Sequence, residues 1–165
     1  MNTDPDFVGV QRLIESHKLQ WEHFCEWADN HEWDRFHSNH YDWWAFPIDR
    51  PSSFGFMYTV FESEISQMKS DKGFMERHRD CARLLMLSWG WDAQNDTEIK
   101  RPSSSQKWAH WPIRLAKCSR SMWLFGQLDL WQSTSQYAEQ LLSDGFSFWY
   151  NGRDLFGEIV SPEDF

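Results

Sequence analysis

Apolar residues recur every three or four positions along most of this chain, which is the spacing of one helical face. The clearest run begins at Phe74, with Asp71 placed to cap a first turn and Gly90 placed to end the helix. The pattern predicts a helix over about residues 72–89. Its buried face is expected to comprise Phe74, His78, Cys81, Ala82, Leu85 and Trp89.

A second strong pattern follows Pro112, a residue favoured at the first helical position. This helix is predicted to end near Gly126 and to direct Leu115, Cys118, Met122 and Phe125 inward, with Arg114, Lys117 and Ser121 on the opposite side. Thr59 followed by Glu62 has capping-box spacing and predicts a helix of about three turns. Further helices are expected over about 5–16, 19–30 and 133–143, with loops over 48–55 and 92–105.

These elements predict an all-α fold, a single domain over residues 1–165 with six to eight helices, a short N-terminal helix and an irregular C-terminal tail after Gly145. The one strand candidate is 146–150. The longest aliphatic run is Leu84–Leu87, far below the ~20 residues of a membrane-spanning helix. No basic leader precedes an apolar stretch, so we expect a cytoplasmic protein without membrane contact.

Aromatic residues are unusually abundant: 12 Trp, 13 Phe and 4 Tyr among 165 residues. Because each buries roughly 150–250 Å², a core of this size cannot hide them all, and some Trp faces are expected to remain at the surface. Cys25, Cys81 and Cys118 are widely spaced, which indicates reduced core thiols and not a disulfide framework.

The charges are unevenly distributed. The formal net charge is −9, yet the stretch between Ile99 and Leu128 has no acidic residue. The six bases in that stretch are Lys100, Arg101, Lys107, Arg114, Lys117 and Arg120, which leaves 10 bases against 25 acids, or −15, elsewhere. Either this segment pairs internally with the acidic body or it binds an anionic partner. The acidic body disfavours duplex DNA.

Motifs of enzyme chemistry are missing from the chain. There is no G-x-S-x-G elbow and no glycine-rich phosphate loop, so no cofactor is expected. His37 and His40 could share a helical face and are weak candidates for a metal site with Asp42, but no H-E-x-x-H or paired cysteine accompanies them. Hydrogen-bonded structural histidines are the alternative.

The segment Trp33–Ile48 resembles the conserved domain of the opioid growth factor receptor family, in which His-Tyr is followed by Trp and then by Phe-Pro. His40, Tyr41, Trp43 or Trp44, Phe46 and Pro47 occupy those places. Residues 59–65, 83–91 and 114–127 resemble later family motifs in the same order, so the resemblance covers about 21–142. It implies a helical fold, in a compact version like that of a bacterial or phage member.

We therefore predict a non-enzymatic binding module for a peptide or protein. Its anchors are expected to be Trp43, Trp44, Trp108 and Trp111, with Arg114 and Lys117 holding an anionic group. Two alternatives stay open: an acidic inhibitor of a host defence protein, encoded by a phage or mobile element, and a metal-dependent hydrolase built on His37, His40 and Asp42. The oligomeric state is not predicted, nor whether residues 41–47 and 100–120 share one surface.

Overall fold

The computed structural model describes residues 1–165 and confirms the all-α prediction. It has eight α-helices, two small hairpins and one 3-10 helix. The helices are α1 (Val10–Asp29), α2 (Asp34–Ser38), α3 (Asp42–Ala45), α4 (Glu62–Lys69), α5 (Lys72–Ser88), α6 (Pro112–Leu124), α7 (Leu128–Ser143), α8 (Phe156–Val160) and η1 (Pro162–Asp164). The hairpins pair β1 (Trp91–Asp92) with β2 (Thr97–Glu98), and β3 (Trp149–Tyr150) with β4 (Arg153–Asp154).

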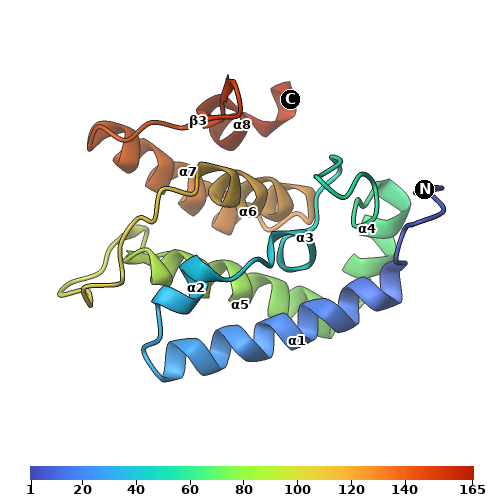
Figure 1. Ribbon diagram of the computed structural model, residues 1–165, viewed down its shortest axis with the longest axis horizontal. Helices are drawn as coiled ribbons and strands as arrows, with labels where there is room; N and C mark the ends of the chain where they lie inside the picture. The colour runs from blue at the N-terminus through green and yellow to red at the C-terminus, as the bar shows by residue number, and fades with distance from the viewer.

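The helices form stacked layers (Figure 1). The long helices α1 and α5 lie side by side and run in the same direction, with Trp21 Nε1 donating to Asp80 Oδ2 at 2.8 Å between them. The α6–α7 hairpin covers that pair, and α8 packs on the far side of α6 and α7. The short helix α3 lies between α1 and α6. This arrangement carries residues 41–47 onto the face of α6.

Helix α1 corrects one prediction. Residues 10–29 form one continuous helix that begins after Gly9, so there is neither a break at residues 17–18 nor a short N-terminal helix. The expected division arose because two buried positions on this face are polar: His17 and Gln20 interrupt the apolar pattern without interrupting the helix. The buried face comprises Leu13, His17, Gln20, Phe24 and Trp27.

The two strongest patterns are confirmed on their inward faces. Every residue assigned to the buried face of α5 is buried, and the Asp71 side chain accepts a hydrogen bond from the Phe74 backbone N–H at 2.9 Å, as a cap does. Leu115, Cys118 and Met122 of α6 are also buried. The opposite side of α6, with Arg114, Lys117 and Ser121, is also covered, because α3, α7 and α8 all pack against this helix.

Helix α4 starts differently from the prediction. Thr59 is not its cap: its hydroxyl donates to the Arg50 carbonyl at 3.1 Å. Glu64 instead accepts from the Phe61 backbone N–H at 3.0 Å and from the Asn2 backbone N–H at 2.8 Å. The Asn2 side chain also donates to the Phe56 and Thr59 carbonyls, at 2.9 and 2.8 Å. The first residues therefore hold the loop over 48–60 in place.

The C-terminal region is more ordered in secondary structure than expected. After Gly145 the chain forms β3, β4, α8 and η1 instead of an irregular tail. Asn151 and Gly152 both have positive φ, at 47° and 83°, which is the geometry of a tight hairpin turn. Leu155 and Ile159 are fully buried and fix this segment on the core.

The aromatic and cysteine predictions agree with the structure. Trp149 is 65% exposed and several other Trp side chains are half-buried, so some Trp faces do remain at the surface. All three cysteines are free, with Cys81 and Cys118 buried and Cys25 half-buried. None of the helices combines the length and apolar character needed to cross a lipid bilayer.

Candidate functional site

The 41–47 segment and the basic helix α6 share one surface, which the sequence left open. Tyr41 is fully buried, and the Arg114 guanidinium lies 4.3 Å from the centre of its ring. Arg114 Nε donates to Asp42 Oδ1 at 2.7 Å, while Nη1 and Nη2 donate to the carbonyls of Phe36 and Asn39 at 2.8 and 2.9 Å. These three contacts attach the segment before and within α3 to α6.

Arg114 therefore does not have the role predicted for it. Only 1% of the residue is exposed, and its side chain is occupied by Asp42 and two carbonyls. The expectation that it presents a cation to a partner is corrected, because α3 covers it. Arg120 is likewise 9% exposed and pairs with Asp49 at 2.6 Å. For these two residues, the alternative of internal pairing with the acidic body is the one the structure shows.

Lys117 is the base on α6 that remains available. Its ammonium lies 5.1 Å from the centre of the Trp43 ring, within the range of a cation–π contact. It makes no hydrogen bond or ion pair with another side chain or with the backbone. Burial lowers the pKa of Lys117, the Asp42 charge acts against this, and the nearby Arg114 charge adds to it. A partly desolvated ammonium without an acceptor has the capacity to bind an anionic group.

A cavity of about 330 Å³ opens beside Lys117. Its walls come from the loop after α3, from α6, and from the C-terminal region. Four bases and one acid line it, namely Arg50, Lys117, Arg120, Arg153 and Glu158. Apolar surface is supplied by Ile48, Pro51, Ile113, Ala116 and Phe165. This cavity is locally positive on a protein whose formal net charge is −9.

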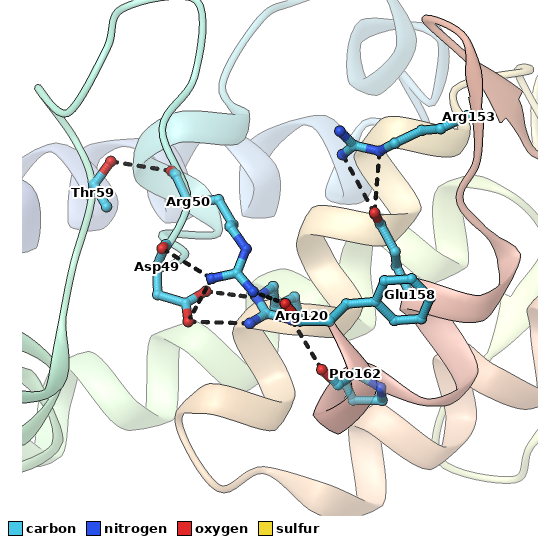
Figure 2. Close-up of polar contacts among 8 residues, drawn as sticks. Asp49, Arg50, Thr59, Arg120, Arg153, Glu158 and Pro162 are labelled. Carbon is cyan, nitrogen blue, oxygen red and sulfur yellow. Dashed lines mark hydrogen bonds and ion pairs between the residues drawn. The ribbon is translucent and has the colours of Figure 1, made fainter.

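We name this hollow the Lys117 cavity, and Figure 2 shows the charged side chains of Asp49, Arg50, Arg120, Arg153 and Glu158 around it. The Asp49 carboxylate lies between two guanidinium groups, 2.6 Å from Arg120 Nε and 3.3 Å from Arg50 Nη1. Burial by itself raises the pKa of Asp49, but the hydrogen bond and charge of Arg120 outweigh it and lower the pKa below its ordinary value. Asp49 is therefore a carboxylate at neutral pH, and the Arg120 charge is compensated.

The C-terminal residues close one side of the cavity. Arg120 Nη1 donates to the Pro162 carbonyl at 3.2 Å, and Arg50 donates to the Phe165 carbonyl. Arg153 pairs with Glu158 at 3.1 Å, and Arg153 is an exposed side chain. The contacts of Arg50 and Arg153 are thus exposed to solvent. Such exposed pairs are worth little, so both cations can turn to a ligand at low cost.

The predicted tryptophans separate into three environments. Trp43 faces Lys117, and Trp44 lies on the other side of the same turn, with its Nε1 donating to Gln20 Oε1 at 3.1 Å. Trp111 is half-buried, 5.3 Å from Arg114. Trp108 is 7% exposed and packs on Trp89 with ring centroids 5.0 Å apart. The prediction of Trp108 as a surface anchor is corrected, because it belongs to the core.

His40, Tyr41, Phe46 and Pro47 also carry the predicted family resemblance, and three of the four are buried. His40 is exposed beside Trp111, with ring centroids 6.4 Å apart. The Tyr41 hydroxyl donates to the Phe36 carbonyl, and Phe46 and Pro47 are buried. Apart from the exposed His40, these side chains pack or bond within the protein, so the conspicuous sequence of this segment reflects the attachment of α3 to α6.

The residues proposed for a metal site do not converge. His37 Nε2 contacts the Ser105 carbonyl at 3.2 Å, His40 faces Trp111, and Asp42 is paired with Arg114. No group of three or more His, Cys, Asp and Glu side chains in the chain is arranged to hold a metal ion. Burial lowers the pKa of His37, which favours its neutral form.

Sequence reasoning missed Asp49, Arg50 and Arg153. Arg50 lies in a loop and Arg153 in the strand β4, and no spacing rule connects either base with Lys117. The turn formed by Asn151 and Gly152 was the available signal for Arg153, because a two-residue Asn-Gly turn predicts a hairpin with defined neighbours. Nothing comparable marks Asp49 or Arg50.

A comparison of the chain with protein-family models, with curated proteins and with solved structures found no match.

Proposed function

We propose that this protein is a non-enzymatic helical binding module that holds an acidic peptide segment of a partner protein in the Lys117 cavity. The observation that carries the proposal concerns Lys117: its side chain lines the cavity, and its ammonium lies 5.1 Å from the Trp43 ring centre and has no hydrogen-bond or ion-pair partner within the protein. A carboxylate placed beside it would regain the ionic contact that burial has removed. The proposal keeps the resemblance to the opioid growth factor receptor domain, which implies a helical module and no reaction.

The surroundings of Lys117 favour a peptide over a small anion. Arg50 and Arg153 lie on different walls, so they can hold carboxylates at separate places along a chain. Trp43 contacts Phe54 with ring centroids 5.0 Å apart, and Phe54 is 48% exposed. This aromatic pair offers an apolar contact next to the cations. A segment that combines Asp or Glu with an apolar side chain matches that surface.

Selection of random heptapeptides on the wild-type protein and on Lys117→Met tests the proposal. Met keeps the length of the side chain and removes the charge. We expect peptides rich in Asp and Glu on the wild type and loss of that enrichment on Lys117→Met. Lys107→Met is the matched control, since Lys107 is an exposed base of the same segment outside the cavity and should not alter the selection.

Affinities then decide the outcome. For a selected acidic peptide, Lys117→Met should weaken binding by about tenfold or more, and added salt should weaken wild-type binding. Selected peptides without acidic residues, or equal affinity for the wild type and Lys117→Met, would overturn the proposal.

A further inference from the structure

A second cavity lies on the opposite side of the Trp43–Trp44 pair, outside the Lys117 cavity. Its volume is about 310 Å³, at the lower end of the range of about 300–1,000 Å³ for small-molecule sites. Trp44 and Tyr58 form an aromatic corner of the wall, with ring centroids 5.7 Å apart and planes at 63°. Val8 and Leu19 add aliphatic surface. We name this hollow the Gln20 cavity.

The Gln20 amide is held in one orientation. An indole N–H can only donate, so the 3.1 Å contact from Trp44 Nε1 fixes the acceptor oxygen of Gln20 toward Trp44. The other end of the amide, Nε2, is buried and has no hydrogen-bond partner. Gln20 as a whole is only 7% exposed, so solvent does not supply the acceptor in this conformation. A buried amide with an unused donor indicates a site that an oxygen acceptor can complete.

The polar residues around this amide lie on one face of α1. Arg12, Ser16, Gln20 and His23 all line the cavity and follow one another at intervals of four, four and three positions. Arg12 makes no hydrogen bond or ion pair, so its guanidinium is free to hold a carboxylate with two parallel hydrogen bonds. No acidic side chain lines the cavity. Arg12 can only donate, and the unused end of Gln20 is a donor, which favours a ligand group that accepts.

We propose that the Gln20 cavity binds a small aromatic monocarboxylate. The carboxylate would accept hydrogen bonds from Arg12 and Gln20, and the ring would pack against Trp44 and Tyr58. A single negative charge matches the one permanent cation of the lining, whereas a phosphate dianion would be only half compensated on a protein of net charge −9. Leu19 is 55% exposed and His23 is also exposed, so both lining side chains can change rotamer when a ligand enters the cavity.

Side-chain NMR of the full chain tests this site with three probes, benzoate, phenylacetate and indole-3-acetate. We expect at least one of them at millimolar concentration to cause saturable shifts of the Gln20 amide and Trp44 indole resonances. Benzamide, which lacks the charge, should bind about tenfold more weakly than benzoate if benzoate is that probe. The absence of saturable shifts at both residues with all three carboxylates would overturn the proposal.

Substitutions separate this site from general charge effects. Arg12→Ala should weaken carboxylate binding by about tenfold or more. Lys18→Ala removes the same charge from an exposed position of α1 outside the cavity and should leave the affinity unchanged. Equal weakening by both variants would overturn the assignment. Lys117→Met should also leave the affinity unchanged, which keeps this test independent of the proposed peptide site.

Gln20→Glu replaces the free amide N–H donor of the side chain with a carboxylate oxygen, which accepts hydrogen bonds. One carboxylate oxygen can still accept from Trp44 Nε1, so the unliganded indole resonance reports whether the local fold is retained. If that resonance is unchanged, the carboxylate ligand should no longer bind, because the ligand carboxylate would then face a side-chain carboxylate and neither group can donate a hydrogen bond. Binding of wild-type strength by a folded Gln20→Glu protein would overturn the role assigned to the Gln20 amide.

Discussion

Arg114 and Asp42 form a buried ion pair, with 2.7 Å between Arg114 Nε and Asp42 Oδ1, in which the guanidinium also donates to two backbone carbonyls. The pair connects α6 with a segment more than seventy positions earlier in the chain. All three guanidinium nitrogens of Arg114 therefore have acceptors inside the protein, and the residue stabilises the packing of α3 on α6. Lys117, less than one helical turn later, makes no hydrogen bond or ion pair and lies against Trp43.

Arg114→Ala is expected to lower the free energy of unfolding by about 3–5 kcal/mol, because it leaves Asp42 and two carbonyls buried without their donor. Arg114→Lys should also be strongly destabilised, since an ammonium cannot reach three acceptors in a fork. Urea denaturation followed by tryptophan fluorescence measures both. Lys117→Met is the control and should change the free energy by less than about 1 kcal/mol. An Arg114→Ala protein as stable as this control would contradict the structural role.

The stability of the protein is expected to fall between pH 6.5 and pH 4. Burial lowers the pKa of His17 from 6.5 to about 4 and holds the pKa of His78 well below its ordinary value. The bonds agree with neutral rings: His17 Nδ1 donates to the Trp44 carbonyl at 3.1 Å, and His78 Nδ1 accepts from Gln127 at 3.1 Å. Because the folded state resists protonation, the stabilisation is complete above pH 6.5 and is lost as the pH falls.

For His17 alone this pKa shift corresponds to about 3 kcal/mol. Urea titrations at pH 7, 6 and 5 measure the slope in a range where the paired carboxylates are still ionised. His17→Gln should flatten the slope, whereas His23→Gln, at an exposed position of the same helix, should not. A free energy of unfolding that stays constant from pH 7 to 5 would show that the two imidazoles are not buried as neutral groups.

Two glycines offer a matched test of close packing. Gly90 and Gly145 both have positive φ, at 84° and 93°. A Cβ at Gly90 would lie 3.0 Å from the Gln106 carbonyl oxygen, whereas a Cβ at Gly145 would meet nothing within 4 Å. Gly145→Ala should cost about 1–2 kcal/mol from backbone strain alone. Gly90→Ala should cost about 1–3 kcal/mol more. Thermal unfolding compares the two, and equal losses would contradict the contact with Gln106.

Cys25 is expected to react slowly with thiol reagents. Burial, with the charge of Asp80 next, raises the pKa of Cys25 from 9.0 to about 11. At pH 8 its thiolate fraction should be lower by about a hundredfold than that of an ordinary thiol. Reaction with a colorimetric disulfide reagent should therefore accelerate about tenfold per pH unit up to pH 10.

Buried Cys81 and Cys118 should react only after unfolding. Cys25→Ser serves as the control: its folded form should be inert, and its unfolded form should release two thiols where the wild type releases three. Rapid reaction of more than one thiol in the folded wild type would contradict the burial of this pair.

The sequence predicted the fold wherever one helical face is apolar and ends in a capping residue, as in α5 with Asp71 and Phe74. It failed where buried positions are polar. Because of His17 and Gln20, the residues of α1 were predicted to form two helices. A hydrophobicity pattern does not show that a polar side chain is buried against a partner on another helix. Arg114 was predicted to hold an anionic group of a partner for the same reason, since its internal partner Asp42 is distant along the chain.

The site could be predicted only in part. Spacing along the chain identified Trp43 and Lys117 separately as candidates, but no local rule states that they lie 5.1 Å apart. Arg50 and Arg153 reach the same cavity through the tertiary packing of a loop and the β3–β4 hairpin, which carries no periodic signal. Local patterns thus predict helices and buried stripes, whereas the meeting of separate loops requires the folded chain.

The anchoring of Asn2 has a consequence for the order of assembly. Its side chain reaches the Phe56 carbonyl 54 positions away, so this contact forms only after a long loop has closed. The loop over 48–60, which carries Phe54, is therefore expected to become ordered only when the N-terminal residues dock on it. In the native protein this loop should open before the helices, and amide hydrogen exchange should be faster over residues 50–58 than in α1 and α5.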